Sequence, residues 1–240
     1  MKRFARTIQI AAISLLMQQD AAAQELAIPE VVYPKLMAHA GSGSDFVPKG
    51  WKLEHEVAGD LNQDGLPDLF LVLKDDDPKN IVSDPGFSEN PVDTNPRILA
   101  VAFKEEAANT YRLIFENHVF VPRITEPVFE DYLDEGGVTI DRGSINISLF
   151  SFGGDIWRPA YQFRYQHGRF ELIGYSDVRV RRSSGELTTT SINFVTRKVE
   201  TTIGTIENDI VKTKTSELKS GPAITMDSIG ESFRFEPLAQ

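Results

Sequence analysis

The feature that most constrains the fold of this chain is a succession of short apolar, β-branched segments separated by turn residues. The sequence Asp-Arg-Gly-Ser follows Ile140, and Gln-His-Gly-Arg follows Tyr165. Segments of this length and composition, bounded by such turns, are typical of β-strands joined by tight hairpins. The segments span residues 52–58, 68–74, 97–104, 111–121, 137–141, 144–152, 159–166, 169–176, 187–195, 198–204 and 209–215.

Several of these segments also alternate in the way that a strand with two different faces requires. In residues 169–175, Phe170 and Leu172 point to one side while Glu171 and Ile173 point to the other. Short strands at this spacing predict a mainly β fold, namely an antiparallel meander that forms a sandwich or an open barrel. We expect a short N-terminal helix at residues 29–40 before the strands begin. The sequence contains no convincing internal repeat, which argues against a complete propeller.

The N-terminus has the order of a secretory signal peptide. Basic residues precede the apolar stretch Ile8–Met17, and small residues follow it at 21–23. The alternative is an amphipathic or membrane-spanning first helix, but this stretch is shorter than the ~20 residues that a bilayer needs. No later segment is apolar enough to span either. We therefore expect residues 1–23 to be removed near Ala23, and the protein to be periplasmic or secreted.

The remaining residues, 24–240, have a length that suits a single β-rich domain. The most plausible break is a stretch rich in Pro and Asp at residues 74–97. The apolar segments on either side of it look like neighbouring buried strands. We therefore expect a long loop at about 75–96 rather than a boundary between two domains.

Charge and composition exclude several classes of function. The chain holds 35 acidic and 25 basic residues, and loss of residues 1–23 would make it more acidic still. An acidic chain lacks the basic face that nucleic acid requires, whereas it is well placed to meet a divalent cation. The sequence has no cysteine, so disulfides, cysteine catalysis and zinc-thiolate sites are excluded.

The most informative motif is GDLNQDGLPDLFLVLK at residues 59–74. Four oxygen-bearing side chains occupy loop positions one, three, five and nine: Asp60, Asn62, Asp64 and Asp68. Gly65 stands at position six, where a calcium loop needs a sharp turn, and the backbone carbonyl of the next residue is a usual ligand. An acidic hairpin turn would explain the Asn-Gln-Asp-Gly part, but not Asp60 and Asp68. The spacing therefore predicts a Ca²⁺ site.

This loop departs from the helical calcium hand in a way that predicts its surroundings. Position twelve, which holds a bidentate glutamate in that motif, is Leu71, and a strand follows Asp68. We therefore expect a hairpin-type loop whose remaining ligands are Asp68, water or the acidic cluster at residues 75–77.

The loop resembles the calcium loops of FG-GAP-type repeats, which have the pattern D-x-[DN]-x-D-G-x-x-D. A wider resemblance covers about residues 46–176, through FVPKGWKLEHEVAGDLNQDGLPDLFLVL, NPRILAVAF and GGVTIDRGSINISLFSFGGDIWRPAYQFRYQHGRFELIGYS. Over these segments the chain is similar to a group of uncharacterised exported bacterial proteins. The resemblance implies secretion and a calcium-type loop, and it implies no established activity.

A second candidate is the aromatic and basic segment FGGDIWRPAYQFRYQHGRF at residues 152–170. Trp157, Arg158 and Tyr161 are residue types that a sugar-binding or peptide-binding surface would use. The simpler interpretation, which we favour, is that Tyr161, Phe163 and Tyr165 share one strand face and fill the core.

We find no convincing catalytic residues in the sequence. Ser216 and Lys219 form an S-x-x-K pattern without its partner motifs, and the histidines are scattered. The favoured function is a non-catalytic exported β-domain with a structural calcium loop, which binds a cell-envelope ligand. The alternative is a hydrolase of polysaccharide or peptidoglycan fragments that uses a carboxylate pair, such as Glu130 with Asp131 or Asp134 with Glu135.

Overall fold

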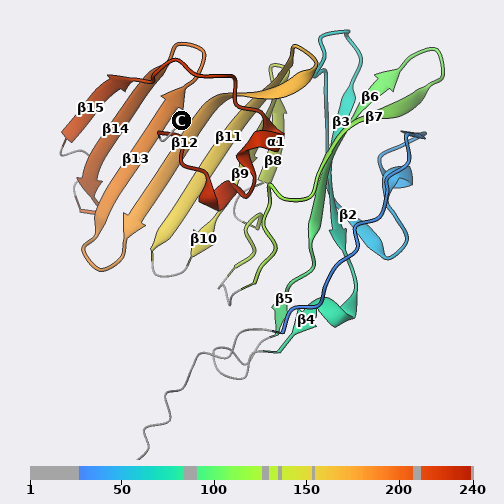
Figure 1. The fold of residues 1–240 in the computed structure, drawn as a ribbon, viewed down its shortest axis with the longest axis horizontal. Coiled ribbons are helices and arrows are strands. Elements are labelled where there is room, and N and C mark those ends of the chain that lie inside the picture. Colours follow the sequence, from blue (N-terminus) through green and yellow to red (C-terminus); the bar gives the residue numbers. More distant parts are fainter. Residues whose placement is uncertain are drawn as a thin grey trace, which may run out of the picture.

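The computed structural model describes residues 27–83, 91–125, 130–134, 137–152, 155–207 and 212–238. Its first sheet has five strands in the order β1-β7-β6-β3-β2, all antiparallel to their neighbours (Figure 1). The strands are β1 (His39–Ala40), β2 (Trp51–Gly59), β3 (Asp68–Asp75), β6 (Arg97–Glu105) and β7 (Thr110–Asn117). A separate pair, β4 (Ile81–Val82) and β5 (Val92–Asp93), lies between β3 and β6 in the chain.

The second sheet has eight strands and is an antiparallel meander with the order β15-β14-β13-β12-β11-β9-β8, in which β10 pairs with β11. Its strands are β8 (Gly137–Asp141), β9 (Ser144–Ser148), β10 (Ser151–Phe152), β11 (Ile156–Gln166), β12 (Arg169–Arg181), β13 (Glu186–Asn193), β14 (Lys198–Thr205) and β15 (Lys212–Glu217). The prediction of a mainly β fold built from antiparallel strands is confirmed.

Two of the predicted turns have the backbone that tight hairpins need. Arg142 and Gly143 join β8 to β9 with φ values of 48° and 69°, and His167 and Gly168 join β11 to β12 with φ values of 54° and 78°. Two successive residues with positive φ match the twist of the strands on either side. The glycine in each pair adopts this conformation at little cost.

The five-stranded sheet is buried on both faces. On one face, Phe70 and Val101 belong to the same hydrophobic core as Ile147 and Phe163 of the second sheet. On the other face, Leu71, Leu73 and Ala100 pack with residues of the N-terminal segment, including Phe46. Burial on both sides explains why β3 is a continuous apolar run rather than an alternating one.

The two sheets approach each other closely beside the predicted calcium loop. A Cβ atom on Gly59, the last residue of β2, would lie 2.5 Å from Cγ2 of Ile140 in β8. A Cβ atom on Gly143 would lie 3.3 Å from the carbonyl oxygen of Asp60. The β2–β3 loop is therefore packed against the β8–β9 turn of the other sheet.

The predicted N-terminal helix at residues 29–40 is wrong. Residues 27–38 run without helix or strand, and β1 follows them. Pro34 lacks the N–H that a helix interior uses, and it disfavours helical backbone at Tyr33. Tertiary contacts hold the extended form, because the Tyr33 ring stacks on His118 with a centroid distance of 4.4 Å and Leu36 is buried.

The short helices lie elsewhere in the chain. The only α-helix of the described residues is α1 (Met226–Ile229), near the C-terminus. Thr225 and Ser228 cap it, since each side chain accepts a hydrogen bond from the other residue's backbone N–H. Single 3₁₀ turns occur at η1 (Ser44–Phe46), η2 (Pro78–Asn80) and η3 (Ser232–Arg234). Among the described residues, no helix has the length and apolar character that a membrane crossing needs.

Two sequence predictions fall wholly or partly outside this description. The signal peptide at 1–23 and its cleavage near Ala23 lie outside the described residues. The long loop at about 75–96 is described except for residues 84–90, and its described part contains η2 and the β4–β5 pair.

Candidate functional sites

The loop at residues 60–67 connects β2 to β3 and is organised by its own acidic and amide side chains. The Asp60 carboxylate accepts hydrogen bonds from the backbone N–H groups of Asp64 (3.1 Å) and Gly65 (3.0 Å). The Asn62 side-chain oxygen accepts from the N–H of Asp64 (2.9 Å), and Oδ1 of Asp64 accepts from the N–H of Leu66 (2.8 Å). These contacts curl the chain tightly around Gly65, whose φ is 86°.

The same contacts bring three of the predicted ligands onto one turn. Nδ2 of Asn62 donates to Oδ2 of Asp64 at 2.9 Å, so these two side chains lie side by side. Asp64 is exposed, and Asp60 and Asn62 are partly exposed. Two carboxylates and an amide oxygen on a short turn form a donor set that suits a hard cation such as Ca²⁺.

Asp68 differs from the other three residues because it is completely buried at the base of the loop. Its Oδ2 accepts from the N–H groups of Leu61 (2.9 Å) and Asn62 (3.3 Å), and its Oδ1 accepts from the N–H of Lys104 (3.0 Å) in β6. Burial raises the pKa of Asp68, and these backbone N–H groups oppose that rise. Asp68 therefore fixes the loop to the neighbouring strand.

The other proposed source of ligands, the acidic cluster at residues 75–77, lies far from this loop. Asp68 begins β3 and Asp75 ends it, which separates them by about 24 Å at ~3.4 Å per residue. In the part of the chain that the structure describes, no three His, Cys, Asp or Glu side chains group as metal ligands. A cation at this loop would therefore depend on Asp60, Asn62 and Asp64, with backbone carbonyls and water.

The three residues of the second candidate do not form one surface. Trp157 and Tyr161 lie on the same face of β11, whereas Arg158 lies on the opposite face, where its guanidinium sits 4.5 Å from the ring centre of Phe150. Tyr161 is only 1% exposed, and its hydroxyl donates to the carbonyl of Ser232 at 2.6 Å. Tyr161 therefore belongs to the core. The glycine pair at residues 153–154 lies outside the described residues.

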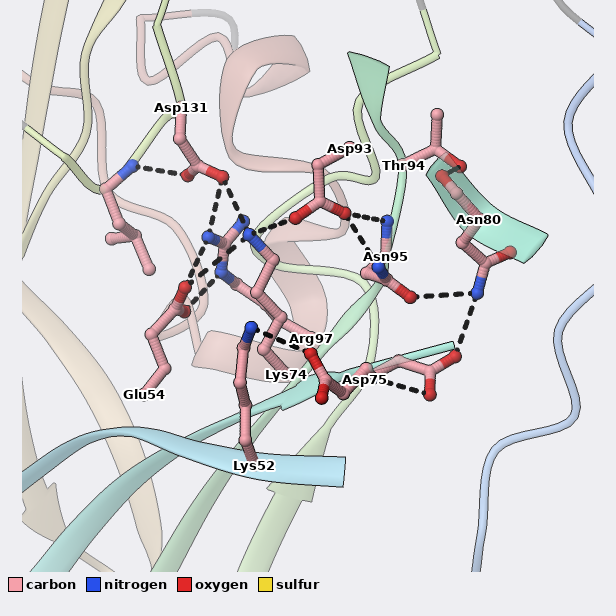
Figure 2. Close-up of polar contacts among 12 residues, drawn as sticks. Lys52, Glu54, Lys74, Asp75, Asn80, Asp93, Thr94, Asn95, Arg97 and Asp131 are labelled. Carbon is pink, nitrogen blue, oxygen red and sulfur yellow. Dashed lines mark hydrogen bonds and ion pairs between the residues drawn. The ribbon is translucent and has the colours of Figure 1, made fainter. Parts of the chain in front are cut away.

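Sequence reasoning missed a third feature, a buried cluster of charges at the far end of the five-stranded sheet (Figure 2). Lys74 of β3 and Arg97 of β6 are direct neighbours in the ladder. Arg97 forms two hydrogen bonds with Glu54 (2.5 and 2.7 Å) and one with Asp131 (2.8 Å). Lys74 Nζ lies 3.1 Å from Asp93, 3.2 Å from Asp131 and 3.7 Å from Glu54.

Amide and hydroxyl groups extend this cluster into the described part of the 75–96 loop. Asp93 accepts hydrogen bonds from both the backbone N–H and the side-chain amide of Asn95. Asn80 donates to Asp75 and to Asn95, and Thr94 donates to the carbonyl of Asn80. Within the described part of this loop, Asp75, Asn80, Asp93, Thr94 and Asn95 therefore form a network with defined partners (Figure 2).

The electrostatics of the cluster favour a structural role over acid–base catalysis. Burial alone would raise the pKa of Asp131, but the charges of Arg97 and Lys74 outweigh it and hold that pKa below its usual value. Burial would lower the pKa of Arg97, but Glu54 and Asp131 outweigh it and raise that pKa. A general acid needs a pKa near the working pH, and a carboxyl group with a lowered pKa stays ionised instead.

The lowered pKa of Asp131 predicts a loss of stability in acid. A group with a lowered folded-state pKa contributes stability above its unfolded pKa, about 3.9 for Asp, and loses it as the pH falls through the folded value. We expect the free energy of unfolding to fall below about pH 4, with a shallower fall in Asp131→Asn. Urea titrations of both proteins between pH 7 and 3 measure this. If the free energy of unfolding falls equally steeply with pH in both proteins, the lowered pKa of Asp131 is contradicted.

The remaining residues that the sequence suggested for catalysis are dispersed. Glu130 is exposed while its neighbour Asp131 joins the buried cluster, and Glu135 lies outside the described residues. Ser216 lies in the edge strand β15 and Lys219 lies just after it, and both are exposed. The sequence carries one signal of this cluster: Lys74 follows the apolar run of β3, and Arg97 precedes the apolar run of β6. The partners of Arg97, Glu54 and Asp131, are remote in the chain.

Comparison of the chain with protein-family models, with curated proteins and with solved structures gives no significant match.

Proposed function

We propose that this chain is an exported, non-catalytic β protein in which the loop at residues 60–68 binds a structural calcium ion, and that it binds a ligand of the cell envelope. The observation that carries the metal role is the arrangement of Asp60, Asn62 and Asp64 around Gly65, with their oxygen atoms on one partly exposed turn. The basic, apolar and small-residue order of residues 1–23 supports export.

A calcium ion at this loop would act on the fold through the strands that the loop joins. β2 and β3 are antiparallel neighbours, and β3 lies in the middle of the core between β2 and β6. The cation would offset the repulsion between the Asp60 and Asp64 carboxylates and would link the two halves of the turn. Asp68 supports the turn from below through its backbone contacts.

Calcium should therefore raise the melting temperature of the protein, and a chelator should lower it. The stabilisation expected from ligand linkage is about 2.7 kcal/mol at a hundredfold excess of calcium over its dissociation constant. Asp60→Ala with Asp64→Ala should remove the response. Differential scanning calorimetry with calcium and with EDTA measures the effect.

A matched control removes two other exposed carboxylates, Asp76 and Glu106, by substitution with alanine. This control changes the net charge by the same amount, so it should keep the calcium response of the unmodified protein. Identical melting curves for the unmodified protein in calcium and in EDTA would reject the metal role.

A further inference from the structure

The outer part of the large sheet stands apart from the five-stranded sheet. Figure 1 shows β13, β14 and β15 at the left, at the end of the meander that is far from β2 and β3. In these three strands, only Ile192 and Val199 belong to the hydrophobic core. Residues 188–190 and 201–203 are all at least partly exposed, although successive residues point to opposite faces. Both faces of the sheet therefore reach solvent here.

β15 forms one edge of this sheet and is exposed along its whole length. All six of its residues are exposed. Among the described residues, β15 pairs with β14 alone. A strand directs backbone N–H and C=O groups to both of its sides, so the side of β15 that faces away from β14 presents these groups to a further strand.

β15 lacks most of the features by which proteins protect an edge strand. Its pairing with β14 continues from Glu217 to Lys212 without the register shift of a bulge. The strand contains no proline, and six residues is an ordinary strand length. The protecting feature that it does carry is charge, at Lys212 and Lys214. These charges therefore decide which partner strands the edge accepts.

The two lysines lie on the same face of β15, because one residue separates them. The residues directly opposite Lys212 and Lys214 on β14 are Ile203 and Thr201, which carry no charge. The carboxylate of β15 itself, at Glu217, lies on the other face. This face of the edge therefore has two positive charges that no directly opposite carboxylate balances, in a chain with a formal net charge of -10.

The charges on β15 favour an acidic partner over a second copy of the chain. Residues that are directly opposite in an antiparallel pair point to the same side of the sheet. Two antiparallel β15 strands would therefore place the lysines of both copies on one face, where like charges repel. A strand with carboxylates at alternate positions would instead set them opposite Lys212 and Lys214. Its β-branched residues would then face Thr213 and Thr215.

We propose that the edge of β15 binds an extended acidic segment of a partner protein, which adds to the sheet as an antiparallel strand with carboxylates opposite Lys212 and Lys214. Backbone hydrogen bonds supply the affinity of such a contact, and the alternation of acidic and β-branched residues supplies its specificity. This inference goes beyond the proposed function, and it depends neither on the calcium loop nor on the envelope ligand.

The test measures the fluorescence anisotropy of three labelled peptides with blocked ends as the protein is added. The first is Thr-Glu-Thr-Glu-Thr-Val, and the second has lysine in place of both glutamates. The third, Glu-Glu-Thr-Thr-Thr-Val, has the composition of the first, but its adjacent glutamates point to opposite faces of a strand. We expect saturable binding of the first peptide, and binding at least about tenfold weaker for the other two.

Lys212→Glu combined with Lys214→Glu should reverse this preference, so that the lysine peptide binds and the acidic peptide does not. Every residue of β15 is exposed, so the variant should fold, which circular dichroism checks. The matched control is Lys49→Glu with Lys79→Glu, two exposed lysines that lie just before β2 and in η2. This control changes the net charge by the same amount and should keep the original preference.

Hydrogen exchange locates the bound peptide, because a strand added to the edge should slow amide exchange in β15. The inference is overturned if the acidic peptide fails to bind, or if the peptide with adjacent glutamates binds equally well. It is also overturned if substitution of Lys212 and Lys214 leaves binding unchanged. A chain that dimerises through β15 before any peptide is added, as seen by sedimentation and by protected β15 amides, would show that a second copy occupies the edge instead.

Discussion

Arg97→Met is expected to destabilise the protein by about 3–5 kcal/mol, because it leaves buried carboxylates without their counter-charge. The Arg97 side chain is 3% exposed, and it contacts both Glu54 and Asp131 with hydrogen bonds of 2.8 Å or less. Lys74 remains nearby, but a single ammonium group cannot replace the forked geometry of a guanidinium. The loss should appear as a lower midpoint in urea.

The origin of this loss of stability can be tested by also neutralising the buried carboxylates of Glu54 and Asp131. Arg97→Met combined with Glu54→Gln and Asp131→Asn should be more stable than Arg97→Met alone, since the buried carboxylates are then neutral. The surface pair of Arg112 and Glu105 serves as a control, because Arg112→Ala should cost only about 0–1 kcal/mol. If Arg97→Met costs no more than Arg112→Ala, the cluster does not stabilise the fold.

Asp68→Ala is expected to have the other large effect, a loss of several kcal/mol that does not depend on calcium. The substitution leaves the backbone N–H groups of Leu61, Asn62 and Lys104 without their acceptor. Each unpaired buried donor costs about 1–3 kcal/mol. Because Lys104 belongs to β6, both the loop and its attachment to the neighbouring strand should loosen.

The response to calcium should distinguish Asp68→Ala from the combined substitution of Asp60 and Asp64. Asp68→Ala should lower the denaturation midpoint both in calcium and in EDTA, whereas Asp60→Ala with Asp64→Ala should lower it mainly in calcium. Hydrogen exchange of the Lys104 amide should accelerate in Asp68→Ala and serves as a local measurement. If Asp68→Ala matters only when calcium is present, Asp68 acts chiefly as a metal ligand rather than as a backbone acceptor.

Local patterns in the sequence predict the strands because their information lies within a few residues. The apolar runs at 68–74 and 97–104 match β3 and β6 to within one residue at each end. The hairpin at Arg142 and Gly143 follows from turn residues that accept positive φ. The helix predicted at 29–40 fails for the opposite reason: long-range contacts of Tyr33 and Leu36, with Pro34 between them, override local helix-forming residues.

The candidate sites show the same difference between local and long-range interactions. Spacing alone identifies Asp60, Asn62 and Asp64 as a group, because they lie on one turn and meet through local hydrogen bonds. Spacing cannot reveal that Asp68 is committed to Lys104, which is remote in the chain. It also cannot distinguish Trp157 from Tyr161. Both contact the C-terminal segment, but only Tyr161, which also packs against Phe120 and Tyr175, is fully buried.

The sequence by itself determines that this chain folds as antiparallel strands and that one of its hairpins carries a cluster of carboxylate and amide oxygens. Only the tertiary structure brings Glu54 and Asp131 to Arg97 and fixes Asp68 to the backbone N–H of Lys104. The physical reason is the range of the interactions. Periodicity and turn preferences act between neighbours in the chain, whereas buried charges depend on which distant segments remove them from water.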